Sequence, residues 1–173
     1  MFHVERLTQI LIPKGIAIFF VIYLALNSCI SSRQTIQIND YLLVPNGKEV
    51  VGTKQLTAFI FENNLTKPPI ERYLSDKFQS DNYSQKEYWV TIEKDKYKII
   101  IYDNAEFEKY FVSANYSVIN ALPENANNGD SRKFIAVSMI NAYNEDCLSD
   151  NSIFQNIAVK YLKQLKDEFY NQR

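Results

Sequence analysis

The stretch KEYWVTIEKDKYKIIIYDN, residues 86–104, has the period-two pattern of a β-hairpin, and the rest of the predicted fold is built around it. Apolar residues alternate with polar or mixed ones on both sides of Lys94 and Asp95, where the charged pair predicts a turn. Successive side chains of a strand point to opposite faces, so the pattern predicts one apolar face and one mixed face. The predicted apolar face consists of Tyr88, Val90, Ile92, Tyr97, Ile99 and Ile101.

Three further segments predict strands that extend this hairpin into a sheet. Residues 35–45 alternate at first and then become continuously apolar, whereas residues 56–61 and 134–143 are rich in apolar and β-branched side chains. Asn46 and Gly47 form a turn signal after the first of these segments. Together with the hairpin, the segments predict an antiparallel sheet of about four to five strands.

The C-terminal segment has the clearest helical pattern in the chain. Ser152 and Gln155 have the spacing of a capping box, which predicts that a helix begins directly after Ser152. The apolar residues that follow share one face, whereas Lys166 and other charged residues fall elsewhere. We therefore expect an α+β fold in which this amphipathic helix covers the sheet. Its predicted apolar face consists of Ile153, Phe154, Ile157, Ala158, Tyr161, Leu162, Leu165 and Phe169.

Two shorter segments complete the expected fold. A second short helix is predicted near residues 68–78, because two prolines suit a first helical turn and apolar residues follow at helical spacing. The sequence leaves open whether residues 103–114 are helix or strand. Asp103 and Glu106 have capping-box spacing, whereas the alternation that begins at Phe107 also fits a strand.

The apolar run IAIFFVIYLAL, residues 16–26, raises a separate question about the N-terminus. A membrane-spanning helix needs roughly 20 apolar residues, so this run is too short, and it lacks the polar face of a core helix. Arg6 and Lys14 precede the run as the basic region of a signal peptide does, and Cys29 follows it closely. The run therefore predicts a signal peptide, with an uncleaved N-terminal anchor as the alternative.

The tetrad Leu26-Asn27-Ser28-Cys29 resembles the lipobox of bacterial lipoproteins, with Leu at −3, a small residue at −1 and Cys at +1. The resemblance implies a signal peptide over residues 1–28. It also implies a lipidated Cys29, carrying acyl chains such as palmitate, at the start of a short tether over residues 29–35.

Residues 36–173 then form a single α+β domain. Two acyl chains suffice for stable membrane anchoring. Because Ile30 rather than Asp follows the cysteine, the family analogy implies a cell-envelope protein on the periplasm-facing outer membrane.

Composition excludes several chemistries. A net charge of −1 over 173 residues gives no electrostatic footprint for nucleic acid, and 4 Gly leave no glycine-rich phosphate loop. His3 is the only histidine and lies in the predicted leader, so the mature chain lacks a histidine-based catalytic triad and a histidine ligand for zinc. Cys147 is the only free thiol once Cys29 is acylated, which excludes an intrachain disulfide. No cofactor is expected.

The stretch NEDCLSDNS, residues 144–152, is the first candidate site. Glu145, Asp146 and Asp150 supply the oxygen ligands that calcium prefers. We favour the competing interpretation, a solvated loop whose acidic residues serve the following helix, because the EF-hand spacing and its glycine are absent. An acidic neighbour raises the pKa of a thiol, so Cys147 is predicted to be a buried and inert cysteine.

Aromatic residues of the hairpin form the second candidate site. Trp89, Tyr88 and Tyr102 are a candidate binding surface for a protein or glycan, since Tyr and Trp are enriched at interfaces. The alternative is packing beneath a helix, because one face of the hairpin must be core. Glu106 and Glu108 form a carboxylate pair of the kind that glycoside hydrolases use, although nothing in the sequence places two carboxylates across a cleft.

These observations predict a lipid-anchored cell-envelope protein that is a non-enzymatic binding or accessory subunit. Its expected partners are the membrane, through the acyl chains, and an envelope protein. Within the same class, an immunity lipoprotein that neutralises a secreted toxin is an alternative. A hydrolase without histidine that uses Asp and Glu is the alternative from a different class. A deep cleft with two facing carboxylates would favour the hydrolase, and an exposed aromatic or acidic surface would favour binding.

Overall fold

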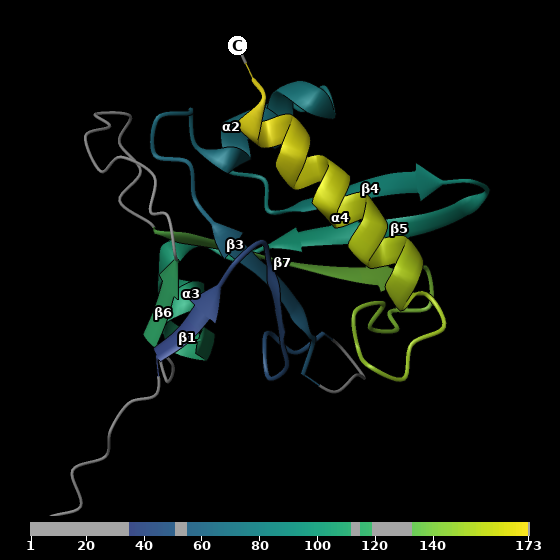
Figure 1. Ribbon diagram of the computed structural model, residues 1–173. Coiled ribbons are helices and arrows are strands. Elements are labelled where there is room, and N and C mark those ends of the chain that lie inside the picture. Colours follow the sequence, from purple (N-terminus) through teal and green to yellow (C-terminus); the bar gives the residue numbers. More distant parts are fainter. Residues whose placement is uncertain (1–34, 51–54, 112–114, 119–132, 173) are drawn as a thin grey trace, which may run out of the picture. The chain divides into compact units, whose positions relative to one another are not determined.

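The computed structural model describes residues 35–50, 55–111, 115–118 and 133–172, all of which lie in one unit, Gln34–Arg173. The fold is α+β with a five-stranded antiparallel sheet, as predicted (Figure 1). The strands are β1 (Thr35–Ile38), β2 (Leu42–Val44), β3 (Ala58–Glu62), β4 (Glu87–Ile92), β5 (Asp95–Ile101), β6 (Asn115–Val118) and β7 (Phe134–Asn141), and the helices are α2 (Ile70–Lys77), α3 (Asn104–Phe111) and α4 (Gln155–Tyr170).

The strand order of the sheet is β2-β3-β7-β5-β4, and all neighbours are antiparallel. The predicted hairpin is confirmed as β4 and β5, but its turn lies one residue earlier than expected. Ile92 pairs with Asp95, so Glu93 and Lys94 form the loop. Glu93 has a φ of 57°. Two-residue hairpin loops require such positive φ values because only these turns match the twist of the strands.

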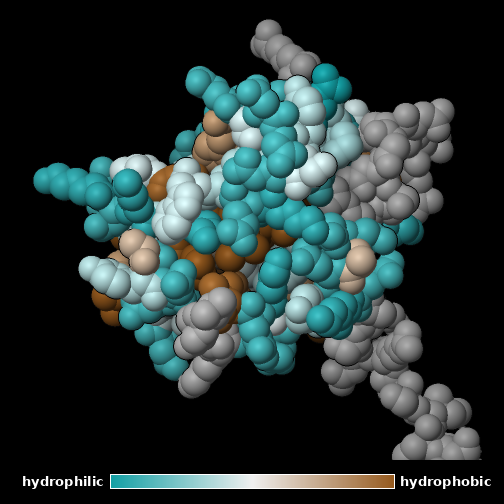
Figure 2. Space-filling model, turned by 180° about the vertical axis from the view of Figure 1, so that it is seen from behind, coloured by the Kyte–Doolittle hydropathy of each residue, from teal (hydrophilic) through white to brown (hydrophobic). Residues whose placement is uncertain are grey.

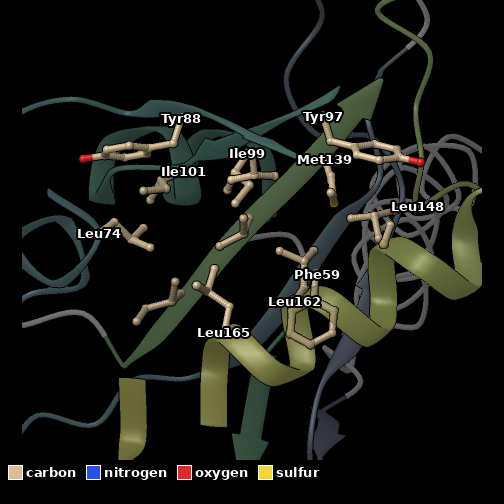
Figure 3. Packing of buried hydrophobic residues seen from close by; sticks show 14 of the residues in the cluster. Phe59, Leu74, Tyr88, Tyr97, Ile99, Ile101, Met139, Leu148, Leu162 and Leu165 are labelled. Atoms are coloured by element: carbon tan, nitrogen blue, oxygen red, sulfur yellow. The ribbon is translucent and has the colours of Figure 1, made fainter. Parts of the chain in front are cut away.

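One face of the sheet packs against α4 and α2, and this interface is the larger core. In Figure 3, Leu162 and Leu165 of α4 point toward Phe59, Ile99 and Met139 on the strands. The prediction that the C-terminal helix covers the sheet is therefore confirmed. The predicted helix near 68–78 is also present as α2, which adds Ile70 and Leu74 to the same core.

The opposite face of the sheet is also covered over part of its area. Helix α3 and the parallel pair β1–β6 contribute to a second core that contains Ile60, Ala136, Tyr102 and Phe111. Figure 2 views this side and shows apolar residues between hydrophilic ones. Burial on both faces explains why β3 and β7 are almost continuously apolar in sequence, as is typical of a strand that has no solvent-facing side.

The segment 35–45, predicted as one strand, is divided between two sheets. β1 pairs with β6, β2 pairs with β3, and the chain bends between them. Asp40 lies in this bend and forms ion pairs with Lys163 (2.9 Å) and with Lys166 of α4. Burial raises the pKa of Asp40, but the hydrogen bonds from Lys166 and Lys163 hold it below its usual value. Lys166, predicted to lie off the core-facing surface, is only 6% exposed.

The ambiguous segment after the hairpin is a helix. α3 begins with a reciprocal capping box, in which the N–H of Glu106 donates to Asp103 Oδ1 (2.8 Å) and the N–H of Asp103 donates to Glu106 Oε2 (3.2 Å). Such a pair satisfies backbone donors that the first turn of a helix leaves without partners. The strand interpretation of the segment that begins at Phe107 is therefore wrong, and the strand β6 begins only at Asn115.

The start of α4 differs from the prediction. The helix begins at Gln155 rather than directly after Ser152, and its N-cap residue is Phe154, which makes no side-chain cap. Ser152 instead accepts the N–H of Phe154 on its Oγ (3.2 Å) in a turn that precedes the helix. Because of this turn, Ile153 is not on the apolar face of the helix, and its side chain is 86% exposed.

Gly47 allows a close approach between the loop after β2 and the second core. Tyr102 accepts the N–H of Lys48 (3.0 Å) and contacts Ser138 Oγ (2.9 Å), which donates to the carbonyl of Thr57 (2.7 Å). A Cβ atom on Gly47 would lie 2.5 Å from Tyr102 Oη. No room is left there for a side chain.

We expect Gly47→Ala to lower the free energy of unfolding by about 1–3 kcal/mol, because overpacking forces the neighbours to move. Urea denaturation of the full chain, followed by circular dichroism, measures the change. The cost should be smaller in a Tyr102→Phe background, where the nearest clashing atom is absent. An unchanged stability of Gly47→Ala would contradict the close packing.

Candidate functional site

The loop between β7 and α4, residues 142–154, presents two large apolar side chains to solvent. Tyr143 is 84% exposed and Ile153 is 86% exposed, more than any other large apolar residue in the described ranges. A single exposed apolar residue is common on protein surfaces and needs no explanation. Here two of them belong to one loop whose backbone is fixed by many hydrogen bonds, and this combination makes the loop the candidate site.

The beginning of the loop is held by Asn141 at the end of β7. Its Oδ1 accepts the N–H groups of Tyr143 (2.9 Å) and Glu145 (3.0 Å), and its Nδ2 donates to Glu145 Oε2 (2.6 Å). The N–H of Asn144, which has a φ of 62°, donates to the carbonyl of Asn141 (3.1 Å). These contacts close a tight turn directly after β7, and they fix the position of the Tyr143 backbone.

The middle of the loop is attached to the sheet by Asp146. One carboxylate oxygen accepts the N–H of Thr57 (2.8 Å), and the other accepts the N–H of Leu148 (2.8 Å). In addition, the N–H of Cys147 donates to the carbonyl of Met139 on β7 (2.9 Å). Hydrogen bonds to a charged acceptor are stronger than neutral ones, so Asp146 is the main anchor of the loop.

The end of the loop is held from α4. Gln155 Nε2 donates to the carbonyl of Leu148 (3.0 Å) and lies 3.4 Å from Asp150 Oδ1. Together with the turn at Ser152, this contact fixes the backbone on both sides of Ile153. The loop is therefore ordered before any partner arrives, which lowers the entropy that a partner must overcome on binding.

An open groove of about 750 Å³ runs between this loop, the edge strand β2 and the segment that precedes β3. Leu43, Pro45, Ile153 and Phe154 give it apolar walls. Its charged lining residues are all acidic, namely Glu145, Asp146 and Asp150. Such a surface fits an apolar segment that carries a basic side chain, because the two charges would then be complementary.

The calcium candidate receives no support from the arrangement of its three carboxylates. Glu145 is engaged with Asn141, Asp146 with two backbone N–H groups, and Asp150 lies near Gln155. Over the ranges that the structure describes, no group of three or more His, Cys, Asp or Glu side chains is placed to hold a metal ion. The acidic residues thus hold the loop and line its groove.

Cys147 is a buried thiol, as predicted. Its side chain is 0% exposed. Burial raises the pKa of the thiol to about 12, and the neighbouring carboxylates of Asp146 and Glu145 add to this shift. Nucleophilic chemistry requires the thiolate, which burial and the raised pKa disfavour near neutral pH.

The predicted aromatic surface is wrong for two of its three residues. Tyr88 and Tyr102 are 2% and 1% exposed, because Tyr88 packs on Phe78 in the larger core and Tyr102 belongs to the hydrogen-bonded network beside Gly47. Only Trp89 is exposed, at 55%. The alternation along β4 already indicates that Trp89 and Tyr88 point to opposite faces of the sheet. The burial of Tyr102 in the second core has no such local signal in the sequence.

The carboxylate pair of α3 has structural contacts. Glu106 accepts a hydrogen bond from Lys48 Nζ (2.8 Å) and caps its own helix. Burial raises the pKa of Glu106, but the contacts with Lys48 and with the N–H of Asp103 hold it below its usual value. Glu108 is exposed and accepts a hydrogen bond from Asn104 (3.0 Å). These contacts account for both side chains without a catalytic role.

The predicted leader, the lipobox-like tetrad and Cys29 lie outside the described residues. Within the described part of the chain, no helix has both the length and the apolar character that a membrane span requires. No known family model, curated protein or solved structure shows significant similarity to this chain. The candidate site therefore rests on its own geometry.

Proposed function

We propose that this protein is a lipid-anchored cell-envelope protein, and that it is a non-enzymatic binding subunit that recognises a protein partner through the loop 142–154. The observation that carries the proposal is the exposure of Tyr143 and Ile153 on a loop fixed by side-chain hydrogen bonds to its backbone. The resemblance of residues 26–29 to a lipobox supports the anchor and, by analogy, a position on the periplasmic side of the outer membrane.

The two exposed side chains can supply much of the binding energy. Complete burial of an Ile side chain contributes about 1.5–3 kcal/mol, and Tyr is among the residues that dominate interface energies. In the isolated chain Ile153 gains almost none of this energy, because it is 86% exposed. A partner with an apolar recess would therefore gain affinity from Ile153 without disturbing the fold.

The acidic lining of the groove supports a partner with a basic side chain next to its apolar contact. Complementary charges at an interface increase the association rate more than they increase affinity, and salt screens them. Asp150 is exposed and lines the groove, so it is available for such a contact. We expect association to slow as ionic strength rises.

The use of the acidic side chains also supports binding rather than hydrolysis. A carboxylate-based hydrolase needs one carboxyl group as an acid and a second as a base or nucleophile, both free to meet the substrate. Asp146 has both oxygens occupied by backbone N–H groups, and Glu145 is hydrogen-bonded to Asn141. Both oxygens of Asp146 and one oxygen of Glu145 are therefore engaged in contacts that hold the loop.

A photo-crosslinking amino acid at position 153 of the full chain, expressed in the bacterium that encodes it, tests the proposal. We expect one dominant adduct to a single protein at position 153 and the same adduct at position 143. The matched control is position 76, an exposed site on α2. Mass spectrometry of the adduct separates a resident envelope protein from a secreted toxin, the partner of an immunity protein.

Two results would contradict the proposal. One is the absence of an adduct at both loop positions in cells that retain the protein in their membranes. The other is the same set of adducts at positions 153 and 76, which would mean that the loop makes only random contacts.

A further inference from the structure

Among the described strands, β4 is an outer strand of the sheet, and it lacks most of the features that protect an edge against pairing. It pairs with β5 on one side, and no described strand lies on its other side. It is six residues long, and its sequence EYWVTI contains no proline, glycine or lysine. Edge strands of soluble proteins are usually shortened, bulged or protected by Lys or Pro, because an open edge recruits another strand.

The hydrogen-bond pattern of the hairpin identifies the backbone groups that face outward. The N–H of Ile101 donates to the carbonyl of Lys86 (2.8 Å), and residues 92 and 95 flank the two-residue loop as a pair. Bonding alternates along an antiparallel strand, so residues 88, 90 and 92 bond to β5, and residues 87, 89 and 91 direct their N–H and C=O groups to the open edge.

One of these outward groups already has a partner. Gln85 Nε2 donates to the carbonyl of Glu87 (2.6 Å). Among the described residues, no hydrogen bond beyond the hairpin uses the backbone groups of Trp89 or Thr91. The backbone groups of β4 that lack a protein hydrogen bond therefore lie at and next to Trp89, whose side chain is 55% exposed.

The side chains beside this edge carry complementary charges. Lys98 Nζ lies 5.0 Å from the centroid of the Trp89 ring and 3.0 Å from Glu87 Oε2. Lys96 is paired in register with Thr91, and it is exposed. Within the described ranges, the structure gives Lys96 no acidic partner, so one acidic group could be accommodated next to Thr91.

We propose that β4 pairs with the β4 strand of a second copy of this chain, antiparallel and around a two-fold axis at Trp89. In this register Trp89 lies opposite Trp89 of the second copy, and Glu87 lies opposite Thr91. All outward backbone groups then find partners once Gln85 releases the Glu87 carbonyl. The two sheets become one continuous ten-stranded sheet, with an isologous interface of the kind that closed dimers use.

The charges favour a second copy over an unrelated strand. Glu87 is the one charged side chain of β4, and in this register it faces Thr91 rather than its own equivalent. In the second copy, Thr91 is paired in register with Lys96 on β5. Each Glu87, which already contacts Lys98 of its own chain, therefore gains a second lysine neighbour across the interface. In this register the two Trp89 rings lie side by side between two Lys98 side chains. Aromatic cross-strand pairs and cation–π contacts of this kind stabilise strand pairing. This assembly goes beyond the proposed function.

Cysteine cross-linking of the full chain in membranes tests the register. Trp89→Cys should give a disulfide-linked dimer on mild oxidation, because the two α-carbons would lie about 5.5 Å apart. Glu87→Cys or Thr91→Cys alone should give none, since each would lie about 14 Å from its equivalent along the strands. Co-expression of Glu87→Cys chains with Thr91→Cys chains should restore the disulfide-linked dimer, because these two positions lie opposite each other. This experiment also retains the natural Trp89.

Thr91→Pro provides an independent measurement by sedimentation in detergent. The N–H of Thr91 faces the open edge, where proline is tolerated, so the monomer should keep its melting temperature. The dimer should be lost, because proline cannot donate the hydrogen bond across the interface. Equal cross-linking at positions 87, 89 and 91, no cross-linking of either Trp89→Cys or the co-expressed pair, or an adduct with a different protein would overturn the proposal.

Discussion

Leu162→Asp is expected to unfold the domain or to leave it barely stable. Leu162 is 2% exposed and points from α4 into the larger core against the sheet (Figure 3). The substitution removes apolar contacts and places an unpaired carboxylate in a packed interior. Either change costs about 2–5 kcal/mol, and natural domains have only about 5–15 kcal/mol of stability. Urea denaturation of the full chain, followed by circular dichroism, measures the loss.

Lys160→Asp is the matched control for this substitution. It introduces the same carboxylate into the same helix at an exposed position. Surface substitutions of this kind usually change stability by less than about 0.5 kcal/mol. If Leu162→Asp unfolds at the same urea concentration as the control, α4 does not cover the sheet as described.

Cys29→Ser is expected to move the entire protein out of the membrane fraction or to leave an unprocessed precursor. The prediction follows from the proposed lipidation, because a serine hydroxyl cannot replace the thiol as acyl acceptor in this processing. Two acyl chains hold a protein stably, at about 0.8 kcal/mol for each buried CH₂ group, so the expected change in membrane binding is all or none. Intact mass and detergent phase partitioning of the purified chain measure it.

Cys147→Ala is the control for the loss of a thiol. Cys147 is buried and is the one free cysteine in the described part of the chain, so its replacement should leave membrane partitioning unchanged. If Cys29→Ser retains the mass and the partitioning of the natural chain, the lipoprotein proposal is wrong, and an N-terminal anchor that is not cleaved takes its place.

The strongly periodic segments were predictable because local patterns and tertiary packing agree there. The alternation in residues 86–104 appears as β4 and β5, and the apolar stripe centred on Leu162 packs on the sheet. The capping-box spacing of Asp103 and Glu106 favoured a helix, and the structure has both of its hydrogen bonds. In these cases, neighbours in the sequence supply the decisive contacts.

The remaining features depend on partners far away in the sequence. The predicted strand 35–45 bends at Asp40, which pairs with lysines of α4, and no local pattern in the sequence predicts that contact. Burial of Lys166 follows from the same pair. Ile153 fits the helical stripe in the sequence, yet the turn at Ser152 delays the helix and exposes the side chain. The sequence pattern therefore placed Ile153 on the buried face of the helix, and its exposure could not be predicted from that pattern.

If the loop 142–154 binds the partner, the affinity of that partner for the full chain depends on Ile153, and Ile153→Asp measures this dependence. The partner is the protein captured at position 153, titrated against the full chain in detergent. We expect the dissociation constant to rise at least about 30-fold, as for loss of a hot-spot residue worth about 2 kcal/mol. Tyr83→Asp, at an exposed aromatic residue outside the loop, should leave it unchanged. Equal affinities for Ile153→Asp and the natural chain would mean that the loop does not bind the partner.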